Sequence, residues 1–141
     1  MRPITRRALF LTLLAAAGTA CGGVFSHDDS GETRSVSLVT PLSVSDAHDR
    51  ALAWFIREGY GLVDLSGVLV RADKQRLLGA GRDQQRDVLS VSLTAAGDGT
   101  RVTIDLITYL VENGVSRQAA QVSAEARQDA ERLAQDLMIR P

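Results

Sequence analysis

The sequence contains few of the residues that build metal, redox and base-stacking sites. Its 141 residues include one cysteine and two histidines, and aromatic residues make up 4%. A single cysteine excludes an internal disulfide framework and any zinc or iron–sulfur site made of several cysteines. Because the formal net charge is −1 and aromatic rings are scarce, the chain lacks the basic patch and stacking platform typical of nucleic-acid binding. We therefore expect no nucleic-acid partner and no cofactor.

Residues 1–20 have the pattern of a cleaved signal peptide. The chain begins with a positive segment containing Arg2, Arg6 and Arg7, and a run of ten mostly apolar residues follows at 8–17. A helix of ten residues spans about 15 Å, which is half of a bilayer's hydrocarbon core. This length is typical of a signal peptide and too short for a permanent transmembrane helix.

The segment Leu14–Cys21 (LAAAGTAC) resembles the lipobox of bacterial lipoproteins, with Gly18 where that family usually has an aliphatic residue. The resemblance implies diacylglyceryl transfer to the Cys21 sulfur, cleavage between Ala20 and Cys21, and acylation of the new amino terminus. In enteric members of this family, an aspartate directly after the cysteine retains the lipoprotein in the inner membrane. The resemblance, with Gly22 at this position, therefore implies the outer membrane, facing the periplasm. The alternative is an ordinary secretory signal with an incidental cysteine.

Thr5–Phe10 (TRRALF) also resembles a twin-arginine export motif, which leaves the export route open between the general secretory and the twin-arginine system.

Removal of residues 1–20 takes away three arginines, leaves 121 residues and makes the formal net charge −4. Residues 21–33 contain the cysteine followed by Gly, Ser and acidic residues, and they predict a flexible tether. Such a tether keeps the domain within about 40 Å of its anchor.

With 45% hydrophobic and 23% charged residues, the composition is typical of a globular domain. We expect residues 34–141 to form a single α+β domain with the order β-α-β-β-β-α. Alternating apolar residues predict strands at 35–40, 62–70 (with a bulge at Gly67), 88–94 and 101–111. Helices are expected from a Ser43 or Ser45 cap to Gly59, and over 116–138. We expect an antiparallel four-stranded sheet with both helices packed on one face.

This order, with Gly59-Tyr60 directly after the first helix, resembles small uncharacterised bacterial lipoproteins and the helix-grip domains of outer-membrane assembly lipoproteins. The resemblance implies an accessory, partner-binding role rather than a reaction. We expect Trp54 and Tyr60, which flank the end of the first helix, to pack in the core rather than to edge a ligand groove.

No pattern in the sequence predicts a catalytic or metal site. His27 lies in the tether, where no scaffold fixes coordination geometry. His48 and Asp49 are neighbours on the first helix, where side chains diverge by about 100°. No serine has a Gly-x-Ser-x-Gly context, and Cys21 is expected to carry lipid.

The segment Arg71–Asp87 (RADKQRLLGAGRDQQRD) links two predicted strands and is locally positive, with five basic and three acidic residues. We expect a partner-docking arm whose apolar anchors lie inside a basic rim. The residues expected to dock are Leu77, Leu78, Arg76 and Arg82. The alternative is a longer strand that turns at 79–81.

Together these features predict a membrane-anchored cell-envelope lipoprotein that is not an enzyme and binds a protein or an envelope component. One alternative is a periplasmic carrier of a small, lipid-like ligand, which requires a sizeable apolar pocket. Another is a small hydrolase, which requires polar groups that converge in a cleft.

Overall fold

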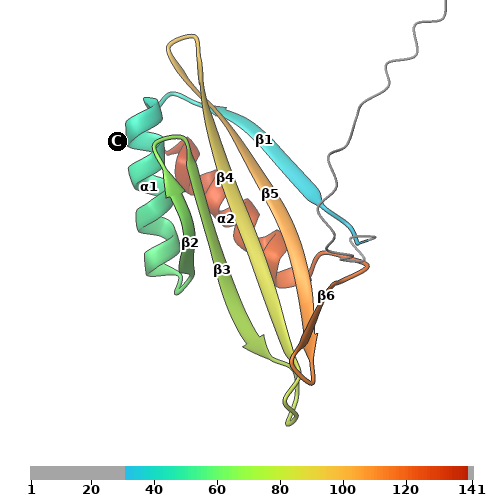
Figure 1. Cartoon of the computed structure of the whole chain (residues 1–141). Helices are drawn as coiled ribbons and strands as arrows, with labels where there is room; N and C mark the ends of the chain where they lie inside the picture. Colours follow the sequence, from blue (N-terminus) through green and yellow to red (C-terminus); the bar gives the residue numbers. More distant parts are fainter. Residues whose placement is uncertain (1–30, 140–141) are drawn as a thin grey trace, which may run out of the picture.

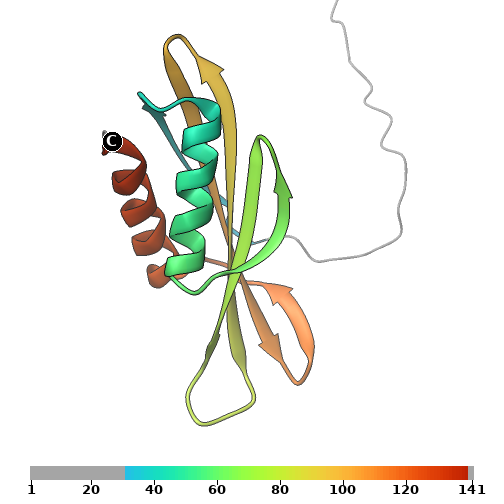
Figure 2. The ribbon, with the colours of Figure 1, turned by 90° about the vertical axis from the view of Figure 1, so that its left-hand side faces the viewer.

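The computed structural model describes residues 31–139 as a twisted antiparallel sheet with two helices on one of its faces (Figures 1 and 2). The sheet order is β1-β5-β4-β3-β2, and β6 also pairs with β5. The elements are β1 Arg34–Thr40, α1 Val44–Arg57, β2 Gly61–Ser66, β3 Leu69–Leu77, β4 Gln84–Ala96, β5 Gly99–Glu112, β6 Val115–Gln118 and α2 Ala124–Met138. The α+β class and the two helices are confirmed, whereas the sheet has six strands instead of the four expected.

Some of the sequence predictions lie outside the described residues. These are the signal peptide, the lipid attachment at Cys21 with cleavage after Ala20, and the tether up to position 30. No helix among residues 31–139 is both long and apolar enough to cross a bilayer.

The first additional strand arises because the segment 62–70 is a hairpin and not one strand. β2 ends at Ser66 and β3 begins at Leu69, and these two residues face each other in an antiparallel pair. Gly67 therefore lies in a tight turn rather than in a bulge. A single strand with a bulge and a hairpin with a tight turn both show an apolar run around a glycine. Only the pairing of β3 with β4 distinguishes the hairpin from the bulged strand.

The second additional strand, β6, replaces the expected beginning of the last helix. Asn113 and Gly114 have positive φ angles of 51° and 82°, which is the backbone that a two-residue hairpin turn requires. They fold β6 back onto β5, and α2 begins only at Ala124. The Ser123 side chain caps α2 by accepting a hydrogen bond from the Ala126 N–H.

The segment 71–87 forms a long β3–β4 hairpin. This matches the alternative in which the strand is longer and turns at residues 79–81. Its turn, residues 78–83, is closed by the Leu78 N–H, which donates to the Asp83 carbonyl at 2.9 Å. Gly79 has a φ of 67°, which favours glycine at this point of the turn. In both views this hairpin and the β5–β6 hairpin project beyond the helices (Figures 1 and 2).

The hydrophobic core fills the layer between the helices and the sheet. α1 begins at its Ser43 cap and ends before Gly59, which has a φ of 78°, as predicted. Trp54 and Tyr60 are 2% and 5% exposed and pack against Phe55, with ring centroids 5.5 and 5.3 Å from that of Phe55. Their prediction as core residues is confirmed. The other large, fully buried side chains include Leu89, Ile104, Leu106, Leu133 and Leu137.

Candidate functional site

A buried polar network joins the start of α2 to the sheet. At its centre is Asp87 of β4, which has no exposed surface. Its Oδ1 accepts hydrogen bonds from Thr108 Oγ1 at 2.7 Å and from Ser123 Oγ at 2.8 Å. Its Oδ2 accepts one from Gln85 Nε2 at 3.0 Å and pairs with the guanidinium of Arg76. One carboxylate thus connects β3, β4, β5 and the cap of α2.

Asp129 of α2 is the second carboxylate of the network and is 3% exposed. Its Oδ2 accepts hydrogen bonds from Tyr60 Oη at 2.6 Å and from Arg76 Nη2 at 3.1 Å, and its Oδ1 pairs with Arg132. The Arg76 side chain therefore bridges two buried carboxylates. Lys74 adds a positive charge 5.3 Å from the centre of the Tyr60 ring.

The protonation states in this network follow from burial and from its internal contacts. Burial, together with the Asp129 carboxylate, raises the pKa of the Tyr60 phenol far above its usual value, so the phenol stays a donor. Burial alone raises the pKa of the Asp129 carboxyl, but the hydrogen bonds from Tyr60 and Arg132 and the charges of Arg132 and Arg76 outweigh this effect. The net result is a lowered pKa. Since each carboxylate is neutralised from within the protein, the network acts as a structural clamp.

The structure separates the four residues expected to dock a partner. Arg76 points inward, and its guanidinium is committed to the two buried carboxylates instead of a basic rim. Sequence reasoning missed Asp87 and Asp129 as its partners. A hairpin centred on residues 79–81 was the available signal, because it places Arg76 opposite Gln85 and therefore two residues from Asp87 on the same face of the sheet.

The other expected docking residues lie at the tip of the β3–β4 hairpin. Leu77 is 70% exposed and Leu78 is 41% exposed, and Arg82 is also exposed. These side chains are therefore available to a partner, unlike that of Arg76.

The histidines do not form a metal site in the described part of the chain. His27 lies outside the described residues. The His48 and Asp49 side chains do meet, with Nδ1 and Oδ1 3.2 Å apart, because both bend toward each other from adjacent helical positions. Residues 31–139 contain no group of three or more His, Cys, Asp or Glu side chains placed to hold one ion.

Within residues 31–139, the outer edge of the sheet at β2 has the largest run of exposed apolar residues. All six residues of β2 are exposed, and β2 pairs with β3 on one side only. We define the β2 edge by three apolar residues of β2 and one in the turn that follows it, which are 44 to 55% exposed: Leu62, Val63, Leu65 and Val68. A bulge between Leu62 and Asp64 shifts the register of this strand.

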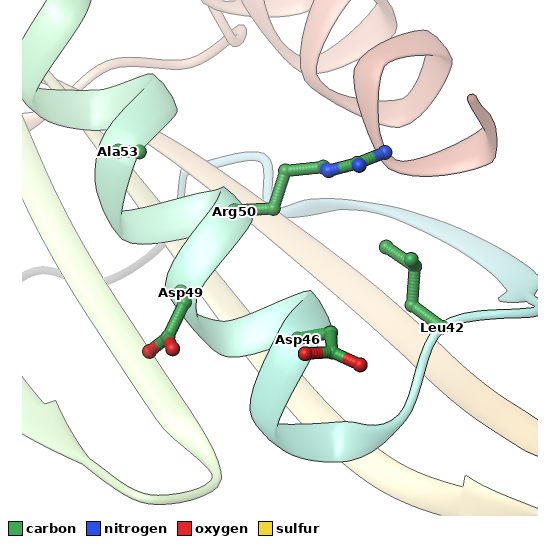
Figure 3. A pocket seen from close by; sticks show the side chains of 5 residues that line it. All are labelled: Leu42, Asp46, Asp49, Arg50 and Ala53. Atoms are coloured by element: carbon green, nitrogen blue, oxygen red, sulfur yellow. The ribbon is translucent and has the colours of Figure 1, made fainter. Parts of the chain in front are cut away.

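The hollows of the surface are open. One, of about 440 Å³, is lined by Leu42, Asp46, Asp49, Arg50 and Ala53 (Figure 3). Its charged groups do not converge: Arg50 reaches toward α2, where it donates to the Asp136 carbonyl, whereas Asp49 points to the other side of α1 (Figure 3). A second hollow, of about 200 Å³, lies between β1 and α2 and is lined by Arg34, Ser35, Val36, Leu106, Arg127, Ala130 and Glu131.

Comparison with known proteins gives distant structural likenesses only. No family model and no curated protein matches the sequence. A DUF4468 family protein from Bacteroides ovatus is 10% identical with a TM-score of 0.43, over 77% of this chain and 81% of that one. The Mll3558 protein from Rhizobium loti is 17% identical with a TM-score of 0.40, over 76% and 94%. The protein Ara h 8.0201 is 9% identical with a TM-score of 0.39, over 76% and 92%. TM-scores below 0.5 carry no inference about function.

Proposed function

We propose that this chain is a cell-envelope lipoprotein that is held at the membrane by acyl chains on Cys21 and binds a protein partner without catalysing a reaction. The lipobox-like segment ending at Cys21 supports the anchor. Two or more acyl chains suffice for stable anchoring, so the acidic domain needs no basic membrane-binding face. The glycine after Cys21 favours the outer membrane.

The observation that carries the binding role is the β2 edge. An edge strand presents backbone N–H and C=O groups that have no partner within the sheet, and proteins usually cover such edges or place charges on them. Here four apolar side chains lie within seven residues of an exposed edge, with Asp64 as the only charged residue among them. This combination favours addition of an extended strand from a partner, in which main-chain hydrogen bonds give affinity and the apolar side chains give specificity.

The internal packing favours this role over the two alternatives. A carrier needs a pocket of about 300–1,000 Å³, and the space between helices and sheet is filled by Trp54, Phe55 and the leucines of α2. A hydrolase needs a base directed at substrate, and the buried carboxylates are occupied by hydrogen bonds and ion pairs within the protein.

The anchor is tested by Cys21→Ser in the producing cell. We expect the domain to move from the membrane pellet to the soluble periplasmic fraction and to lose the mass of the acyl chains, because no other cysteine is present. A variant that stays in the pellet with an unchanged mass contradicts the anchor.

The docking edge is tested by a photo-crosslinking residue placed at Val63, with Val39 on the opposite edge strand β1 as the matched control. The two positions are 51% and 52% exposed. We expect an adduct of one discrete mass at position 63 that disappears when Leu62 and Leu65 are both changed to Lys. Equal adducts at both positions, or an adduct that survives the lysines, would reject the β2 edge as the binding surface.

A further inference from the structure

The two hairpins that project beyond the helices both end at the lower side of the sheet, and Figure 2 shows them diverging toward their tips (Figures 1 and 2). The last pair of the β3–β4 hairpin is Leu77 and Gln84, and Gln84 in turn faces Val111 of β5, which faces Ser116 of β6. These four residues form one row across four strands. Because neighbouring strands are about 4.8 Å apart, Leu77 and Ser116 at the two ends of this row are about 14 Å apart.

Each tip carries an unusually exposed apolar side chain. Leu77 at 70% and Val115 at 67% have the highest exposures among the large apolar residues between 31 and 139. Leu78, at 41%, lies next to Leu77 in the turn. Val115 precedes Ser116, which shares a row with Leu77, so Leu77 and Val115 lie on opposite faces of the sheet at the same end of the molecule.

The described chain begins beside the same hairpins. A side chain at Gly31 would collide with the Ala119 carbonyl and the Gln118 side chain, so Gly31 lies directly against the end of β6. Gln118 Nε2 donates to the Glu32 carbonyl at 3.2 Å, and the Val122 N–H donates to the Glu32 carboxylate at 3.1 Å. This start is three residues from Val115 along β6, or about 10 Å.

The charges around the tips are almost neutralised. Arg117 pairs with Glu112 at 3.0 Å on the β5–β6 hairpin, and Arg86 pairs with Asp73 at 2.5 Å on the neighbouring strands. Arg82 stands exposed in the β3–β4 turn, with Asp83 beside it. A nearly neutral end with exposed apolar side chains, and with the Arg82 guanidinium outside these two ion pairs, suits a phospholipid surface, where apolar groups enter the acyl boundary and guanidinium groups meet phosphates.

We propose that the tips of the β3–β4 and β5–β6 hairpins insert Leu77, Leu78 and Val115 into the lipid surface to which the chain is anchored. This inference rests on the proposed acylation of Cys21. The ten residues 21–30 then separate the anchor from Gly31, and ten residues cannot span more than about 36 Å. The anchor keeps the tips at a high local concentration next to the bilayer. Three apolar side chains are too few to hold an unanchored domain at the membrane, but they suffice to orient the anchored one.

The test places a tryptophan at each tip of the acylated protein. Leu77→Trp and Val115→Trp are compared with Val39→Trp, which is a matched control because Val39 is also an exposed apolar residue, at 52%, and lies outside the β2 edge. Val39 lies near the other end of the sheet, because it faces Arg101, which is ten residues, or about 33 Å, along β5 from Val111 in the row of Leu77. Trp54 is 2% exposed in the core and gives a constant background that the unsubstituted protein measures.

The proteins are reconstituted into phosphatidylcholine vesicles whose acyl chains carry bromine, a quencher that acts only at close range. We expect the fluorescence added at positions 77 and 115 to shift to the blue and to be quenched, and the fluorescence added at position 39 to keep its solvent-exposed maximum. Thermal unfolding of each variant confirms that the domain is intact.

Three outcomes distinguish a failure of the proposed insertion from a failure of the proposed acylation. Failure of the unsubstituted protein to sediment with the vesicles contradicts the proposed acylation. Sedimentation with tips that remain exposed to solvent overturns the insertion of the tips alone. Tips that become protected only in native membranes, and not in vesicles, show a protein partner at this surface and also overturn the proposal.

Discussion

Two carboxylates, Asp87 and Asp129, are almost completely removed from water, and the guanidinium of Arg76 contacts both of them. An ion pair of this kind contributes little compared with a well-packed apolar group, but removing one partner leaves a buried charge without compensation. The position of Arg76 therefore makes it the most sensitive residue of the network.

Replacing Arg76 with Met keeps most of the side-chain volume and removes the charge. We expect Arg76→Met to lower the free energy of unfolding by about 3 kcal/mol in urea titrations at neutral pH, because both carboxylates lose a cation. The control is Arg82→Met in the turn of the same hairpin, which should change stability by less than about 0.5 kcal/mol. Similar, small losses in both variants would show that Arg76 is not needed to compensate the carboxylates.

The Tyr60 hydroxyl makes stability depend on alkaline pH. In the unfolded chain a tyrosine loses its proton near about pH 10, whereas in the fold burial and Asp129 raise the pKa of Tyr60 above that range. The stabilisation is therefore fully present below about pH 10 and is lost as the pH rises further.

We expect Tyr60→Phe to lower the free energy of unfolding by about 1–2 kcal/mol at neutral pH, because the Asp129 carboxylate loses a donor. The variant should also lose less stability than the natural sequence between about pH 9 and pH 11, as measured by urea unfolding at each pH. Tyr109→Phe is the control and should retain the full alkaline loss. If both variants follow the same pH curve, the raised pKa of Tyr60 does not contribute to stability.

Sequence reasoning reached these residues only in part. It assigned Tyr60 to the core and Arg76 to a docking rim, and it did not connect Asp87 with Asp129. Tyr60 and Asp129 are 69 positions apart, and their contact depends on how α2 lies over the sheet. Local pattern contains no information about such a contact, whereas it does identify caps and turns.

At the scale of secondary-structure elements, the two helices begin at similar serine caps that have different surroundings. Ser43 accepts a hydrogen bond from the Asp46 N–H at 3.1 Å on the exposed start of α1. Ser123 does the same for the Ala126 N–H at 3.0 Å and also donates to the buried Asp87. The cap of α2 is therefore part of the network.

We expect Ser123→Ala to cost about 2 kcal/mol of unfolding free energy and Ser43→Ala about 1 kcal/mol, because only the first change also removes a donor from a buried carboxylate. Chemical denaturation of the two variants side by side measures the difference. Equal losses would mean that the cap alone, and not its bond to Asp87, accounts for the effect.

Elements with a local signal were predictable, and elements that depend on pairing were not. The sequence limited the cap of α1 to Ser43 or Ser45, of which the structure has Ser43, and the predicted stop at Gly59 is confirmed. The turn at Gly67 and the strand β6 needed knowledge of the partner strands. Asn113-Gly114 was nevertheless a strong turn signal, and giving it more weight than the helix formers after it would have revealed β6.

At the scale of the whole molecule, the fold closes through the last turn of α2. The Thr40 hydroxyl at the end of β1 donates to the Leu137 carbonyl at 2.6 Å, and Leu137 itself is completely buried. Arg50 of α1 donates to the Asp136 carbonyl at 3.3 Å. The sheet edge and both helices therefore meet at residues that come last in the described chain, and a shorter chain lacks this junction.

Truncation tests this dependence directly. A chain that ends at Asp136 loses the Leu137 side chain from the core and the acceptor of the Thr40 hydroxyl, and we expect it to lose at least about 3 kcal/mol of unfolding free energy. A chain that ends at Ile139 keeps both and should unfold within a few degrees of the full chain, because Ile139 is itself 61% exposed. Thermal unfolding monitored by the fluorescence of buried Trp54 reports both transitions. Two truncated chains with the same midpoint would show that the closing junction does not stabilise the domain, and that the core formed by α1 and the sheet holds without it.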